Sequence, residues 1–150
     1  EENRIAEQAY KKIEQEFDPE NTGVIVLDDD NWQQGIIGIV SSRITEKYGL
    51  PSILISFDGS TRGYPEGDDI GKGSGRSIKG LNLVDALNYC SDCLVKYGGH
   101  ELAAGLSVKR ELLPTLRLAL NALKSCSPIK YLTAFFIFSL QSVSISRRHP

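Results

Sequence analysis

Residues 23–57, GVIVLDDDNWQQGIIGIVSSRITEKYGLPSILISF, decide the fold of this 150-residue chain. Apolar runs at the two ends, 23–27 and 52–57, have the length and the Val and Ile content of buried strands. Between them apolar residues recur with helical spacing over about 34–48, and Gly49 suits the position after a helix. The face of this helix predicted to point inward holds Ile36, Ile37, Ile39, Val40 and Ile44. A strand, a helix and a strand in this order predict a parallel pair with a helical crossover.

The flanking sequence predicts further elements on both sides of this unit. They are an amphipathic helix over 3–17, an edge strand over 70–78 despite its three glycines, a strand over 102–108 and a last helix over 111–124. Another helix is expected to begin after Asn82, to bury Leu94 and Val95, and to end at Gly98. The predicted fold class is therefore α/β, with a mixed, mainly parallel central sheet and flanking helices.

Composition and net charge limit the classes of protein to which this chain could belong. Hydrophobic residues make up 41% and charged residues 24% of the chain, as in folded soluble proteins, and three cysteines do not form a disulfide framework. These features favour a reducing, cytoplasmic setting without a membrane partner. The net charge of −2 argues against a generic nucleic-acid coat, although only basic charges follow Glu111. Any contact with nucleic acid is therefore expected to be local.

Two glycine-rich motifs form the candidate functional site. In Gly71-Lys-Gly-Ser-Gly-Arg-Ser77, backbone N–H groups could form a nest for an anion, and the arginine could bind a phosphate through two N–H groups. In Gly98-Gly99-His100, a histidine, the side chain that most readily changes charge near neutral pH, follows two glycines with few backbone restrictions. There it could contact a phosphate. The competing interpretations are a flexible hairpin rim for the first motif and a helix-terminal glycine pair for the second. The predicted substrate-binding residues are Lys72, Gly73, Ser74, Gly75, Arg76, Ser77, Gly98 and Gly99.

Three other groups have weaker functional interpretations. Asp28-Asp29-Asp30 could hold a metal ion, but no second ligand group is near in the sequence, and a solvated strand end is favoured. Cys90 and Cys93 have the spacing of a redox or zinc half-site but are predicted to be two half-buried thiols within a helix. Trp32 is either a hydrophobic staple, which is favoured, or a platform for base stacking. No metal or other cofactor is predicted in this chain.

Five blocks of the sequence are 32–44 (WQQGIIGIVSSRI), 51–55 (PSILI), 71–78 (GKGSGRSI), 83–87 (LVDAL) and 98–106 (GGHELAAGL). In their order and spacing they resemble the C-terminal DHH-associated domain of the RecJ-type single-strand-specific exonucleases. The resemblance covers about residues 20–122. It implies a domain that grips a DNA strand beside a DHH domain, absent from this chain, that binds two Mn²⁺ or Mg²⁺ ions.

The resemblance also implies roles for matched residues. Ser74 and Arg76 would bind a phosphate at the 5′ end of the strand. His100, the predicted catalytic residue, would stabilise charge at the scissile phosphate on the side opposite the metal ions. Gln33 stands where the family usually has histidine.

The predicted function is that of the substrate-binding lobe of a single-strand-specific 5′-to-3′ DNA exonuclease of DNA repair and recombination, inactive without its catalytic domain. Residues 1–19 are expected to be a helix or linker from that missing domain, 20–124 the DHH-associated domain, and 125–150 a tail of uncertain status. The predicted partners are single-stranded DNA and the DHH domain of the same protein. The alternatives are a phosphodiesterase of the same superfamily that acts on short oligonucleotides or cyclic dinucleotides, and a non-catalytic nucleic-acid-binding scaffold.

Overall fold

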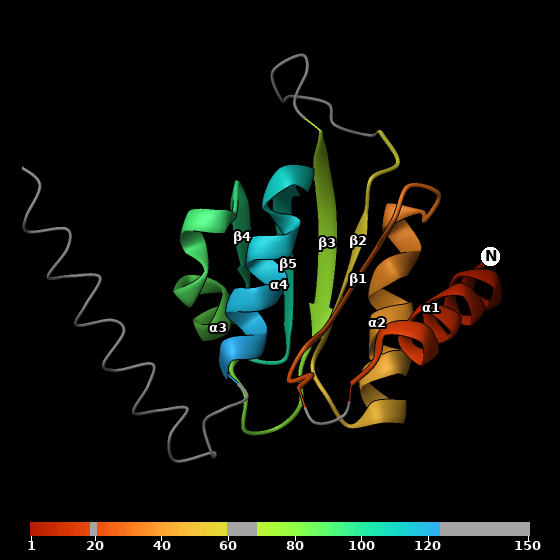
Figure 1. The fold of residues 1–150 in the computed structure, drawn as a ribbon, viewed down its shortest axis with the longest axis horizontal. Helices are drawn as coiled ribbons and strands as arrows, with labels where there is room; N and C mark the ends of the chain where they lie inside the picture. The colour runs from red at the N-terminus through yellow and green to blue at the C-terminus, as the bar shows by residue number, and fades with distance from the viewer. Residues whose placement is uncertain (19–20, 60–68, 124–150) are drawn as a thin grey trace, which may run out of the picture.

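A computed structural model, which describes residues 1–18, 21–59 and 69–123, is built around a five-stranded sheet (Figure 1). The strands are β1 (Ile25–Asp29), β2 (Ser52–Ser56), β3 (Ile70–Arg76), β4 (Lys96–Gly99) and β5 (Ala103–Lys109). Their order in the sheet is β1-β2-β3-β5-β4, and β1 pairs with β2 in parallel. This parallel pair confirms the crossover predicted for residues 23–57. The predicted tail, 125–150, lies outside the described residues.

Helices cover the two faces of the sheet (Figure 1). On one face lie α1 (Glu2–Glu16) and α2 (Gln34–Tyr48), and on the other lie α3 (Leu83–Tyr89) and α4 (Leu113–Ala122). Two short 3₁₀ turns are η1 (Ser91–Cys93) and η2 (Arg110–Leu112). Among the described residues, no helix is both long and apolar enough to span a bilayer.

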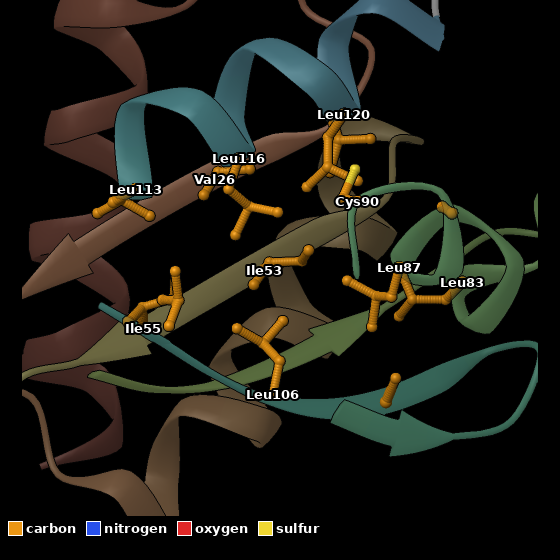
Figure 2. Close-up of a cluster of buried hydrophobic side chains, with 14 of the residues drawn as sticks. Val26, Ile53, Ile55, Leu83, Leu87, Cys90, Leu106, Leu113, Leu116 and Leu120 are labelled. Atoms are coloured by element: carbon orange, nitrogen blue, oxygen red, sulfur yellow. The ribbon is translucent and has the colours of Figure 1, made fainter. Parts of the chain in front are cut away.

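Strands β1 and β2 each contribute to two hydrophobic cores, because successive side chains point to opposite faces of the sheet. Under α3 and α4, Figure 2 shows Ile53 and Ile55 of β2 beside Leu106 of β5, beneath leucines of both helices. On the other face, Leu54 packs with α1 and α2 around Trp32, whose side chain is fully buried. The sheet is therefore the middle of three layers, and residues that share a face share an environment.

The mixed α/β class is confirmed, but the balance of strand directions differs from the expectation. The prediction of a mainly parallel sheet is wrong, because the β2–β3, β3–β5 and β4–β5 pairs are all antiparallel. Residues 100–102 alone join β4 to β5, and so short a turn can join only antiparallel strands. The predicted edge strand at 70–78 is central instead, with β2 and β5 on its two sides.

The predicted helix that begins after Asn82 is shorter than expected. The Asn82 side chain accepts a hydrogen bond of 3.1 Å from the Asp85 N–H, which confirms the predicted cap. The helix ends at Tyr89 rather than at Gly98, and residues 96–99 form β4 at the free edge of β5. Valine, tyrosine and glycine are weak helix formers, so pairing with β5 prevails there.

One side chain of α2 does not lie where the apolar periodicity places it. Ile39 is 53% exposed, although it is predicted to point inward. The helix packs on β2 and β3, and its remaining flank borders the part of the sheet formed by β5 and β4.

Candidate nucleic-acid interface

The first glycine-rich motif forms β3, and its glycines point toward the core under α3 and α4. A Cβ atom at Gly71 would lie 2.6 Å from Cγ2 of Ile55, and one at Gly75 would lie 3.0 Å from Cδ2 of Leu83. These positions exclude larger residues because neighbouring side chains occupy the space. The strand pairs along both edges, so its backbone N–H groups lie in the ladders. The predicted nest for an anion is therefore wrong, and the glycines serve packing instead.

The opposite face of β3 carries three polar side chains that align in rows with β5 and β4. The rows are Arg76–Ala103–His100, Ser74–Gly105–Gly98 and Lys72–Ser107–Lys96. Successive rows lie two residues apart along the strands, which is a step of about 6.6–6.8 Å. The two sequence motifs, more than twenty residues apart in the chain, thus share one face. Basic or imidazole groups end two of the rows, and small residues occupy the middle strand.

A groove with a volume of about 370 Å³ lies on this face. It is lined by Gln34, Lys72, Gly73, Lys96, Tyr97, Gly98, Gly105, Leu106 and Ser107. The start of α2 contributes Gln34 to one wall, and β3, β5 and β4 contribute the rest. Lys72, Gly73 and Gly98 were predicted, whereas Lys96 was missed. Alternation along a strand could have identified it, because Lys96 lies two residues before Gly98 and shares its face.

Arg76 is half-buried beside this groove and only partly engaged by the protein. Its Nη1 donates to Ser74 Oγ at 3.1 Å and to the Gly75 carbonyl oxygen at 2.7 Å. Within the described residues, Nε and Nη2 have no hydrogen-bond partner, and no carboxylate pairs with Arg76, Lys72 or Lys96. The Nε–Nη2 edge of a guanidinium is a fork that matches two oxygens of a phosphate.

The second motif forms the end of β4 and a tight turn into β5. The His100 N–H donates to the Ala103 carbonyl oxygen at 2.8 Å, which places the exposed His100 in the same row as Arg76. Gly99 has a φ of 149°, and a Cβ atom there would overlap the backbone of Ala103 and Ala104. Gly98 has no atom within 4 Å of the corresponding position. The glycine pair therefore ends a strand and not, as the competing interpretation had it, a helix.

Comparison with known proteins identifies the family. The DHHA1 domain family matches residues 21–126. This chain belongs to the DHHA1 domain family. The match confirms the resemblance seen in the sequence.

Relatives of this DHHA1 domain are RecJ exonucleases. The chain is 35% identical over 119 residues to the single-stranded-DNA-specific exonuclease RecJ of Bacillus subtilis, covering 79% of the chain and 14% of that protein. It is 39% identical over 93 residues to RecJ of Escherichia coli, covering 59% of the chain and 15% of that protein. The chain therefore spans only a small part of the length of these curated relatives.

Two solved structures share the fold of this DHHA1 domain. The structure of Thermus thermophilus RecJ in complex with Mg²⁺ matches with a TM-score of 0.63 and 31% identity, over 81% of this chain and 17% of that one. A structure of exonuclease RecJ bound to manganese matches with a TM-score of 0.66 and 31% identity, over 85% of this chain and 30% of that one.

Three other residues singled out in the sequence lie away from the groove's lining. In this DHHA1 domain the Ser77 hydroxyl donates to the Leu81 carbonyl oxygen at 2.7 Å. Trp32 is fully buried, and its Nε1 donates to Gln8 Oε1 at 2.9 Å, which excludes base stacking in this conformation. Gln33 is exposed at the N-terminus of α2, where its side chain makes no capping hydrogen bond.

The acidic run at the end of β1 is held by cations from other elements. The ion pairs are Asp28–Arg117 at 3.4 Å, Asp29–Lys12 at 3.3 Å and Asp30–Arg110 at 2.7 Å. Hydrogen bonds from Arg110 to Asp69 and to Asp30 raise the pKa of that guanidinium still further. Over residues 1–18, 21–59 and 69–123, no three His, Cys, Asp or Glu side chains gather in a group that could hold a metal ion.

The two cysteines near α3 are free thiols, as predicted, although they follow the short helix rather than lying within it. Cys90 belongs to the core under α3 and α4, and burial raises its pKa to about 12. Burial also raises the pKa of the Cys93 thiol. A raised pKa disfavours the thiolate that metal binding and redox chemistry require.

Proposed function

We propose that this DHHA1 domain is the substrate-binding lobe of a 5′-to-3′ exonuclease that degrades single-stranded DNA in repair and recombination. The observation that carries the proposal is the row arrangement on β3, β5 and β4. Lys72, Lys96 and Arg76 lie on one face with no carboxylate partner among the described residues, and Gly98 and Gly105 between them are exposed. Unpaired basic groups attract phosphates, and bare glycines let a strand approach closely.

Contacts with the DNA backbone are assigned to the side chains of these rows. The Nε–Nη2 edge of Arg76, together with the Ser74 hydroxyl, binds the phosphate at the 5′ end. Lys72 and Lys96, on either side of the groove, bind phosphates further along the strand. His100, at the end of the Arg76 row, donates a proton or a hydrogen bond at the scissile phosphate. Gly98 and Gly105 leave this surface free of side chains, whereas the Cβ positions of Gly73 and Gly75 face the core under α3 and α4, and that of Gly99 faces Ala103 and Ala104.

Metal chemistry is assigned to the rest of the protein. The described part of this chain offers no cluster of metal ligands, whereas the related RecJ structures contain Mg²⁺ or Mn²⁺. We therefore place the metal ions in a DHH domain outside this chain, where they would activate water. The contribution of this domain is to bind and orient the strand, and the 150-residue chain is expected to bind DNA without cleaving it.

The test is the salt dependence of binding to a single-stranded oligonucleotide. Each phosphate contact contributes about 0.7 to the slope of log K against log salt concentration for single strands. Lys72→Ala and Lys96→Ala should each lower this slope by about that amount. Lys11→Ala, which removes an exposed charge from α1, is the matched control and should leave the slope unchanged.

Two outcomes would overturn this assignment. An equal decrease in all three variants would show a general charge effect rather than a site. Competition by dinucleotides as effective as that by a longer strand would assign the groove to short substrates instead.

A further inference from the structure

Helix α2 is fixed against the backbone of Arg76 by a cluster of buried hydroxyl groups. The Oγ of Ser52 on β2 lies 2.7 Å from Ser41 Oγ and 2.8 Å from Thr45 Oγ1, both on α2. Thr45 Oγ1 also donates to the Arg76 carbonyl oxygen at 3.3 Å. Ser41 and Ser52 are fully buried, so these bonds form without competition from water. The position of the helix relative to β3 is therefore well defined.

On this anchored helix, Gly38 faces the guanidinium of Arg76. A Cβ atom at Gly38 would lie 2.9 Å from Arg76 Nη2 and 3.0 Å from Ser74 Oγ. The neighbouring glycine of the same helix, Gly35, has nothing within 4 Å of its Cβ position. Only Gly38, of the two glycines in α2, is therefore crowded, and the side chains that crowd it are Arg76 and Ser74, which are assigned to the terminal phosphate.

The crowded nitrogen, Nη2 of Arg76, has no hydrogen-bond partner among the described residues. Both protons of Nη1 are used by Ser74 and Gly75, so Nη2 and Nε form the edge that can meet a ligand. Because Nη2 is the far end of a long side chain, a methyl group at position 38 would displace the guanidinium rather than the helix. The displaced group would lose its alignment with a phosphate while the fold stayed intact.

We propose that Gly38 is a positioning residue that sets the preference of this site for a 5′-phosphate over a 5′-hydroxyl end. Its missing side chain lets the Arg76 guanidinium lie against α2 with its Nε–Nη2 edge turned to the ligand, and Ser74 holds the other nitrogen. The inference rests on the proposed function, since it assumes that Arg76 meets the end of the strand.

The experiment compares Gly38→Ala with Gly35→Ala in the 150-residue chain. The dissociation constant is measured for one oligonucleotide with a 5′-phosphate and for its 5′-hydroxyl twin, and the ratio is the readout. Gly38→Ala should lower the preference for phosphate by about tenfold, the value of a hydrogen bond to a charged group. Gly35→Ala should leave it unchanged. Both variants should melt at or above the wild-type temperature, because alanine favours a helix over glycine.

Arg76→Ala separates a failure of this inference from a failure of the proposed function. Loss of the phosphate preference in Arg76→Ala with its retention in Gly38→Ala would overturn the role of Gly38 and leave the function standing. Absence of any preference in the wild type would overturn both. In the double variant, Gly38→Ala should add nothing to Arg76→Ala, because the effect passes through the guanidinium. A further loss there, or unfolding of Gly38→Ala alone, would contradict the positioning role.

Discussion

The two edges of the sheet are built in opposite ways. At the β1 edge, side chains from the flanking helices bind the backbone groups that point outward. Lys12 of α1 donates to the Asp28 carbonyl oxygen at 2.9 Å, and Arg117 of α4 donates to that of Val26 at 3.1 Å. Asn121 accepts from the N–H groups of Gly23 and Val24 at 2.7 and 3.0 Å. An edge closed in this way cannot pair with another strand.

At the opposite edge, no strand among residues 1–18, 21–59 and 69–123 pairs with the outer side of β4. The pairing of His100 with Ala103 makes alternate residues of β4 bond to β5, so the backbone groups of Tyr97 and Gly99 point outward. No side chain of the described residues bonds to them. The β1 side thus holds large apolar groups and satisfied backbone groups, which serve stability. The β4 side holds small residues and cations that have no carboxylate partner in the described part of the chain, and it is the side that we propose for binding.

The largest effect is expected for Trp32→Ala, on the β1 side, which tests whether that side serves stability. The side chain is fully buried between α1 and α2, and its loss should lower the free energy of unfolding by about 3–5 kcal/mol. Urea denaturation followed by circular dichroism measures the change. Under conditions where the variant remains folded, its salt slope for DNA binding should match the wild type. A stable Trp32→Ala variant with impaired binding would reverse the assignment of this side to stability.

A substitution at the β4 side should lower the free energy of unfolding by less, and the size of the loss should depend on which glycine is replaced. Gly99→Ala places a methyl group against the backbone of Ala103 in a conformation that alanine rarely adopts, so a loss of about 1–3 kcal/mol is expected. Gly98→Ala meets no atom within 4 Å and should be nearly neutral to stability. Thermal melts of the two variants give the comparison. Equal melting temperatures would mean that the turn into β5 tolerates either residue.

The sequence predicted the β1 side better than the β4 side, and for a physical reason. The apolar stripe of the first helix, Ile5, Ala9, Ile13 and Phe17, is a local pattern. The first three residues are buried, and Phe17, just after α1, packs partly buried against the same core. The strand 96–99 has no such pattern, because its structure depends on pairing with β5, which follows it in the chain. The secondary-structure propensities of residues 94–99 contain no information about pairing with β5.

The candidate site illustrates the same limit. The order of glycines and polar residues in 71–77 identified the motif, but composition does not distinguish a glycine that turns the chain from one that faces a neighbour. Gly71 and Gly75 are of the second kind, since Ile55 and Leu83 fill the space beside them. Of the side chains that we propose for binding, all but Lys96 were predicted from the sequence, whereas their position on one face follows from strand register, which no single segment encodes.

The smallest change in stability is expected when a hydrogen-bond donor to the edge of β1 is removed. Arg117→Ala removes the hydrogen bonds to the Val26 carbonyl oxygen and the ion pair with Asp28, at a cost of about 1 kcal/mol. It also leaves an outward carbonyl of β1 unpaired, so the variant should associate at high concentration where the wild type stays monomeric at that edge. Leu118→Ala is the matched control, because that neighbouring α4 side chain is 74% exposed and touches neither edge group. Sedimentation velocity over a range of concentrations measures the difference. Identical sedimentation of both variants would show that Arg117 is not needed to keep the edge of β1 from pairing with another strand. The difference between the two edges would then come from the bulk of the flanking helices rather than from their hydrogen bonds.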